Sequence, residues 1–143
     1  MVDLETAEKI ICEFFKQCFG MDSPEILHDE TSVSVNGEGV KLRGKKAYSY
    51  FVSYSCFGTL FVQIMFEANL FDPTADLFWD INIFNEDSAF WKATVPHGDL
   101  CLRCYVYAVE SEDIFIETLM ASLMELKKND SGRHLKELFA YIN

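Results

Sequence analysis

Apolar residues recur at the spacing of an α-helix near the start of the chain. Within residues 3–19 they share one side of such a helix, while charged residues fill the other side. Asp3 stands where an N-cap is expected, and Gly20 stands where a helix commonly ends. The pattern predicts an amphipathic helix over residues 3–19, with an apolar stripe made of Leu4, Ala7, Ile10, Ile11, Phe14, Phe15 and Cys18.

After Pro24 the pattern changes to short extended segments that are separated by turn residues. Asn36-Gly37 is typical of a two-residue hairpin turn, and Phe57-Gly58 separates two segments rich in aromatic and β-branched side chains. Segments of this kind predict antiparallel strands joined by tight turns. The strands expected in this part of the chain are residues 31–35, 40–43, 47–56 and 59–68.

The second half of the chain alternates between helical and extended patterns. Helical spacing and an acidic first turn predict a helix over residues 73–85. Residues 89–95 and 100–109 alternate between apolar and polar positions around the turn Pro96–Asp99, which predicts a second hairpin. A further helix is expected from Ser111 to Lys128, and a short terminal helix after a break at Asn129–Gly132.

These elements predict an α+β domain that spans residues 1–143. The order is α-β-β-β-α-β-β-α(-α), and short turns between neighbouring strands favour a twisted antiparallel sheet of about five strands. The helices are expected to pack mainly on one face of that sheet. Half of the residues are apolar and thirteen are Phe, so the core should be rich in aromatic side chains.

Strand alternation divides the side chains between two faces of the predicted sheet. One face takes Leu100, Leu102, Cys104, Val106 and Ala108, together with Leu60, Val62, Ile64, Phe66 and Ala68, and forms the core. The reverse face collects tyrosine, Met and Arg, which are enriched in protein interfaces. We therefore predict a partner-binding surface on the reverse face, unless one further helix covers it; its residues are Phe61, Met65, Arg103, Tyr105 and Tyr107.

The charge of the chain limits the kinds of partner that it can have. Twelve basic and twenty-three acidic residues give a net charge of −11, which repels nucleic acids and anionic membrane surfaces. The basic run is interpreted as the solvated tip of a hairpin rather than an anion site; it contains Lys41, Arg43, Lys45 and Lys46. A spacing of four residues predicts an acidic ridge on the second helix, either a solvated face or a docking stripe for a basic partner: Asp72, Asp76 and Asp80.

The first residues do not read as a secretory signal, and no window has the length and apolarity of a membrane span. Five cysteines is an odd number, which points to free thiols rather than a disulfide framework. A cytoplasmic protein is therefore expected.

Candidate catalytic and metal-binding residues are few. The Cys101-x-x-Cys104 spacing matches half of a zinc site, but on a strand the two sulfurs point to opposite faces. The three histidines lie in unrelated segments, and phosphate-loop and nucleophile-elbow motifs are absent from the sequence. We expect no catalytic residue, metal or cofactor. The alternative is a small ligand-binding domain or thiol-dependent enzyme that uses Cys56 or His97.

Several segments together resemble the YbjN group, which shares the type III secretion chaperone-like fold. They are the segment Asn82-Ile-Phe-Asn85, the Phe90-Trp91 strand, the strand Asp99-Leu-Cys-Leu-Arg-Cys-Tyr-Val-Tyr, and the acid-led helix after Ser111. The resemblance covers most of residues 3–127 and carries no catalytic residue. It implies an α+β domain, frequently dimeric, that binds other polypeptides or has a regulatory role in bacteria. The cysteine content and the basic-tipped segment 36–46 depart from that group.

The sequence thus predicts a non-catalytic protein-binding module, chaperone-like or a regulatory scaffold, that binds another protein or itself as a homodimer. A second alternative is an immunity or stress-response protein whose acidic ridge neutralises a basic target.

Overall fold

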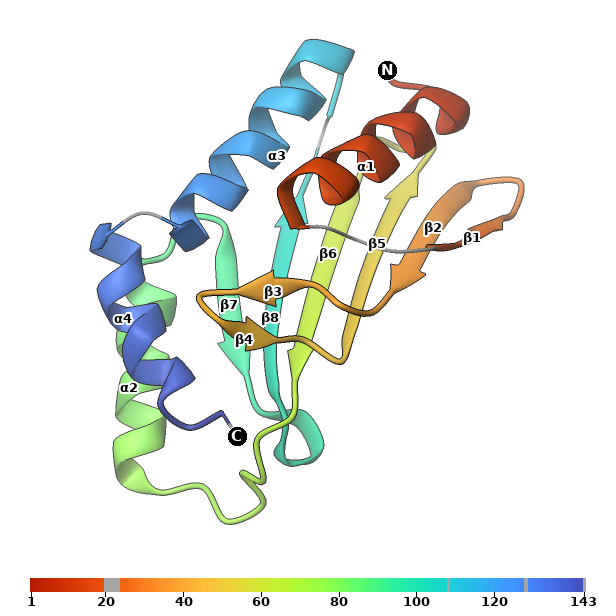
Figure 1. Ribbon diagram of the computed structural model, residues 1–143. Coiled ribbons are helices and arrows are strands. Elements are labelled where there is room, and N and C mark those ends of the chain that lie inside the picture. Colours follow the sequence, from red (N-terminus) through yellow and green to blue (C-terminus); the bar gives the residue numbers. More distant parts are fainter. Residues whose placement is uncertain (20–23, 108, 128, 143) are drawn as a thin grey trace.

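The computed structural model describes residues 1–19, 24–107, 109–127 and 129–142, and it has one extended sheet with helices packed against it (Figure 1). The helices are α1 (Leu4–Phe19), α2 (Ala75–Asp87), α3 (Glu112–Lys127) and α4 (Asn129–Phe139), with a single 3-10 turn, η1 (Pro96–Gly98). The strands are β1 (Glu25–His28), β2 (Ser32–Gly37), β3 (Lys41–Leu42), β4 (Lys45–Lys46), β5 (Ser49–Ser55), β6 (Leu60–Phe66), β7 (Trp91–Thr94) and β8 (Leu100–Val106).

The main sheet has six strands in the order β1-β2-β5-β6-β8-β7, and every neighbouring pair is antiparallel. The small hairpin β3-β4 forms a separate sheet. The predicted α+β class and antiparallel sheet are confirmed, although the sheet is one strand wider than the expected five.

The helices cover one face of the sheet. Figure 1 shows α1 and the β3-β4 hairpin in front of the strands, α3 beside α1 at the margin, and α4 and α2 beside β7. The side chains that β5, β6 and β8 turn towards these elements are buried, as alternation predicted, except for the partly buried Val106. Ala108, also predicted for this face, lies outside the described residues. The core therefore lies between the sheet and this layer. Its large buried members include Tyr50, Tyr54, Phe15, Phe66 and Phe115.

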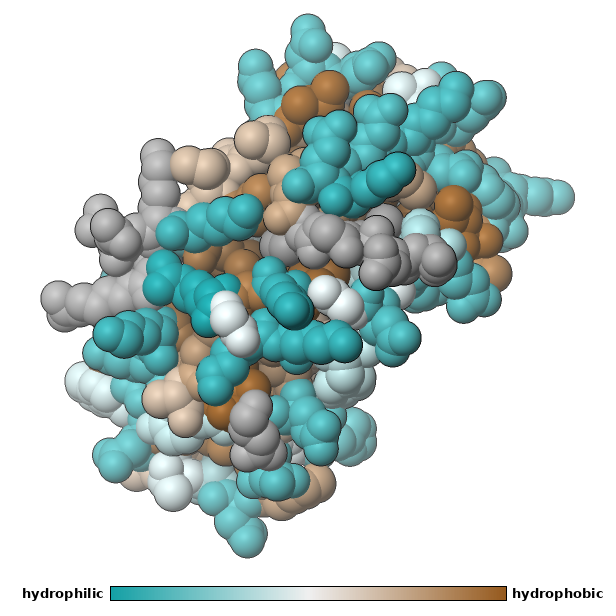
Figure 2. All heavy atoms as spheres, viewed as in Figure 1, coloured by the Kyte–Doolittle hydropathy of each residue, from teal (hydrophilic) through white to brown (hydrophobic). Residues whose placement is uncertain are grey.

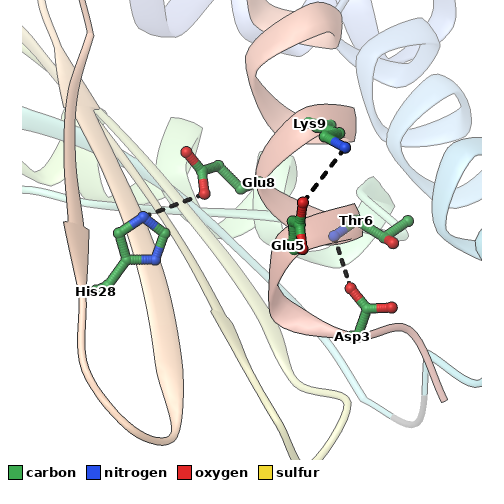
Figure 3. A network of polar contacts seen from close by, with 6 residues as sticks. All are labelled: Asp3, Glu5, Thr6, Glu8, Lys9 and His28. Carbon is green, nitrogen blue, oxygen red and sulfur yellow. Dashed lines mark hydrogen bonds and ion pairs between the residues drawn. The ribbon is translucent and has the colours of Figure 1, made fainter.

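The first helix and the edge strand β1 are fixed by polar contacts (Figure 3). Asp3 Oδ1 accepts the N–H of Thr6 at 2.8 Å, so Asp3 caps α1 as predicted. Glu8 on α1 lies 3.1 Å from His28 Nε2 on β1, which ties the helix to the strand. Gly20, where the helix was expected to end, lies outside the described residues.

The prediction of a hairpin turn at Asn36-Gly37 is wrong. Both residues belong to β2, where they pair with Phe51 and Tyr50 of β5. A Cβ at position 37 would lie 2.5 Å from the Tyr50 ring, so glycine serves the packing of that ring. The tight turn lies instead at Arg43-Gly44 between β3 and β4, where both residues have a positive φ. This places the basic run at a hairpin tip, as expected.

Two helix boundaries also differ from the prediction. Thr74 Oγ1 accepts the N–H of Leu77, so α2 begins at Ala75 rather than at residue 73. The helix α4 begins at Asn129, within the segment that was expected to separate the last two helices.

Candidate functional site

The reverse face of the sheet lies on the side away from α1 and α3. Residues on this face alternate with the buried core residues along each strand, and most of them are partly exposed. The structure describes no helix on this side (Figure 1). The predicted partner-binding residues Phe61, Met65, Arg103 and Tyr105 all lie on it, with Tyr107 directly after β8.

Aromatic rings form a continuous row across three strands of this face. Phe61 stacks on Tyr105 with their ring centroids 4.6 Å apart, because register places the two residues opposite each other on β6 and β8. Phe51 of β5 lies 5.9 Å from Phe61, and Tyr107 lies parallel to Tyr105 at 6.4 Å. We call these four residues, Phe51, Phe61, Tyr105 and Tyr107, the aromatic row.

The sequence prediction missed Phe51. The alternation of residues could have placed Phe51 on the reverse face, since it lies between the buried Tyr50 and Val52 on β5. The exposed end of the row is Tyr107, which keeps 71% of its surface accessible.

A polar pair adjoins the aromatic row. Arg103 and Gln63 are opposite each other on β8 and β6, and Arg103 Nε donates a hydrogen bond to Gln63 Oε1 at 3.0 Å. The next pair along the strands is Met65 with Cys101. Cys101 is fully buried although it lies on the reverse face, and this burial raises the pKa of its thiol. The surface thus combines aromatic, thioether and guanidinium groups.

Few charges lie on this face, although the chain as a whole is strongly acidic. The charged side chains that the strands of the main sheet direct to it are Glu25, Lys92 and Arg103. Lys92 donates from its Nζ to the carbonyl oxygens of Asn85 and Ser88 at the end of α2. Because the net charge is −11 and this face holds one carboxylate within its strands, most of the negative charge lies elsewhere.

The predicted acidic ridge is not formed as expected. Asp72 precedes the Thr74 cap and is not part of α2, so the three carboxylates do not share one side of the helix. Asp80 accepts a hydrogen bond from Tyr141 Oη at 2.8 Å, and this bond contributes most to raising the pKa of Tyr141 to about 12. Only Asp76 is an exposed carboxylate of the predicted set on α2.

The cysteine pair of β8 is divided between the two faces, as expected for a strand. Cys104 is part of the core and Cys101 lies on the reverse face, and burial raises the pKa of both thiols, to about 12 for Cys104. Among the side chains that the structure describes, no three histidine, cysteine or carboxylate groups gather as a metal site would require.

The two groups named for the thiol-enzyme alternative lie at opposite ends of the sheet. Cys56 is in the turn between β5 and β6, next to the pair Leu60–Val106, whereas His97 lies in η1, next to the pair Phe66–Leu100. Six residues of strand separate these ends, which is about 20 Å. The structure does not bring Cys56 and His97 together.

A surface cavity of about 530 Å³ contains neither of these groups. It lies at the end of β2 and β5, and its lining includes Glu25, Glu38 and Lys46 together with Asn36 and Tyr48.

No helix in the described part of the chain has both the length and the apolarity to span a bilayer.

Comparison of the sequence with models of protein families and with curated proteins gave no significant match. Comparison of the fold with solved structures gave a match. The chain is similar to YbjN from E. coli, which is described as a proposed transcription regulator, with a TM-score of 0.53 and 11% sequence identity. The match covers 96% of this chain and 88% of that chain. The fold of this protein is therefore YbjN-like.

Proposed function

We propose that this protein is a non-catalytic binding module whose reverse sheet face binds a segment of another polypeptide, and that it forms a homodimer. The aromatic row is the observation that carries the proposal. Exposed aromatic side chains are costly to leave in water, and their clustering on one side of a monomer marks an interaction surface.

The composition of the surface favours a polypeptide as the partner. Tyr105 and Tyr107 offer large rings with polar hydroxyl groups, and Arg103 offers guanidinium donors, which is the combination enriched at interface hot spots. Phe61 and Tyr105 stack on one another, so one face of each ring is already covered. A base of a nucleic acid would need such a ring face for stacking, and the charge of −11 also opposes a phosphate backbone.

In the cell, we propose a regulatory or chaperone-like role in the cytoplasm. The YbjN-like fold supports a regulatory or binding role only by analogy, because a fold does not determine a function. The absence of catalysis is also part of the proposal. It is supported by the separation of Cys56 from His97 and by the raised thiol pKa values of Cys101 and Cys104.

The test is affinity capture from native lysate with matched variants. Tyr107→Asp places a charge at the exposed end of the aromatic row. Trp79→Asp is the control, because Trp79 is 67% exposed, against 71% for Tyr107, and belongs to α2 rather than to the sheet. We expect Tyr107→Asp to lose a protein that the wild type and Trp79→Asp both retain. Identical captured proteins for all three would contradict binding at this face.

A further inference from the structure

A second apolar surface lies on the outer side of α3. Ile116, Met120 and Met124 are four residues apart, so they form one stripe along the helix, and all three remain exposed. The side of α3 that packs into the protein is formed by other residues: Phe115, Leu119, Ser122, Leu123 and Leu126. Figure 1 shows α3 at the margin of the fold, and Figure 2 shows tan and brown side chains over it.

The stripe continues into a groove between α3 and α1. The groove has a volume of about 160 Å³. It is lined by Ile10, Glu13, Phe14, Gln17 and Cys18 of α1 and by Ile116, Leu119 and Met120 of α3. Flexible methionine side chains adapt readily to an apolar partner surface. The stripe and the groove together form a mainly apolar contact surface on a helix pair, with Glu13 and Gln17 as its polar members.

Charges are distributed unevenly along the same side of α3. Asp113, Met120 and Lys127 are seven residues apart, so they lie on the same side of the helix, about 21 Å from first to last. Asp113 is exposed in the first turn and Lys127 is exposed in the last. Asp113 thus gives this side of α3 an acidic start and Lys127 a basic end, and between them the exposed Glu117 places a second carboxylate beside the apolar stripe.

We propose that this surface is the contact between two copies of the chain, with the two α3 helices antiparallel and a two-fold axis at Met120. In this register Met120 meets the partner's Met120, and Ile116 meets the partner's Met124. Asp113 meets the partner's Lys127. The proposal rests on the homodimer part of the proposed function and specifies the surface that forms it.

The charge pattern favours a second copy as the occupant. The antiparallel arrangement pairs unlike charges at both ends of the contact, whereas a parallel arrangement would oppose Asp113 to the partner's Asp113. Two chains with a charge of −11 each repel one another, so association requires a surface where local charges are complementary. Asp113 and Lys127 provide that complementarity at the two ends of the contact, and association through α3 leaves the reverse sheet face free.

Sedimentation equilibrium with two matched variants tests the surface. Met120→Glu places two carboxylates on the proposed axis, and Ile114→Glu is the control because Ile114 lies on the same helix, outside the stripe, with 44% exposure against 43% for Met120. We expect a wild-type dimer whose dissociation constant rises at least about a hundredfold with Met120→Glu and about threefold or less with Ile114→Glu. A monomeric wild type, or equal effects of the two variants, would overturn the proposal.

A charge exchange tests the register independently. Asp113→Lys and Lys127→Asp should each weaken the dimer roughly tenfold, because each changes two symmetry-related pairs, and the double variant should restore it. Lys127 Nζ also donates to Cys18 O at 3.5 Å, so circular dichroism must show that the variants remain folded. A double variant weaker than either single variant would exclude the antiparallel register. Loss of captured partner with Tyr107→Asp concerns the reverse face alone, so partner binding at that face and the α3 contact fail separately.

Discussion

Two tyrosines of β5 provide a matched test of how the core is held together. Tyr50 and Tyr54 are both fully buried, both point to the core face, and both pack against an aromatic ring. They differ in their hydroxyl groups. Tyr54 Oη donates a hydrogen bond to the carbonyl oxygen of Val2 at 2.8 Å, whereas Tyr50 Oη has no hydrogen-bond partner among the described residues.

The same substitution should therefore have different effects at the two positions. Tyr54→Phe leaves the carbonyl of Val2 without its donor, which costs about 1–3 kcal/mol when the group cannot reach water. Tyr50→Phe removes a buried hydroxyl that is unpaired, so we expect no loss, or a gain of up to about 1 kcal/mol. The ring and its packing are retained in both variants, and no cavity is created.

Urea unfolding followed by tryptophan fluorescence measures this difference. The midpoint should fall for Tyr54→Phe and stay or rise for Tyr50→Phe, with equal m-values for both variants. In thermal unfolding, each kcal/mol corresponds to roughly 2–4 °C for a chain of this size. If Tyr50→Phe destabilised the protein as much as Tyr54→Phe, the hydroxyl of Tyr50 would have a partner and the reasoning would be wrong.

Three further predictions concern the edge of the sheet, the thiols and alkaline pH. Asn85→Ala removes two hydrogen bonds from the Asn85 side chain to the backbone of β7, so stability should fall by about 1–3 kcal/mol and aggregation should rise as that edge opens; denaturation and light scattering measure both effects. In native thiol labelling, exposed Cys56 should react and buried Cys104 only after unfolding; faster reaction of Cys104 would contradict the packing. Burial and the bond to Asp99 raise the pKa of Tyr48 to about 12. The protonated Tyr48 hydroxyl contributes fully to stability below pH 10.0, its unshifted pKa, and this contribution is lost as pH rises to about 12. The urea midpoint of the wild type should therefore fall over this pH range, and that of Tyr48→Phe should fall less.

Local sequence patterns predicted the helices and strands that depend mainly on their own residues. The amphipathic stripe and the Asp3 cap placed α1 to within one residue at its start. Alternation sorted β6 correctly, because that strand has one buried and one open face. It assigned the faces of β8 correctly too, but it did not predict the burial of Cys101 on the reverse face. The edge strand β1 was missed, since it has only four residues and three of them are exposed, which leaves little alternation to detect.

Long-range packing decided what local patterns could not. The Asn36-Gly37 pair is a strong local turn signal, but here Gly37 makes room for the ring of Tyr50 on the neighbouring strand. The apolar residues of α3 nearly surround the helix, so periodicity alone could not show which of them the rest of the chain covers. The apolar stripe was visible only once the buried side of α3 was known.

The positions of the two proposed surfaces have a consequence for affinity. The α3 stripe belongs to the helical layer on one side of the sheet, and the aromatic row lies on the opposite side. A dimer formed through α3 therefore presents two free aromatic rows on one particle. For a partner with two copies of the bound segment, the second contact becomes intramolecular, and the apparent affinity can exceed that of a single contact by a large factor. Loss of the dimer should then weaken capture of such a partner while leaving the affinity for a single isolated segment unchanged, so self-association would control which partners are retained.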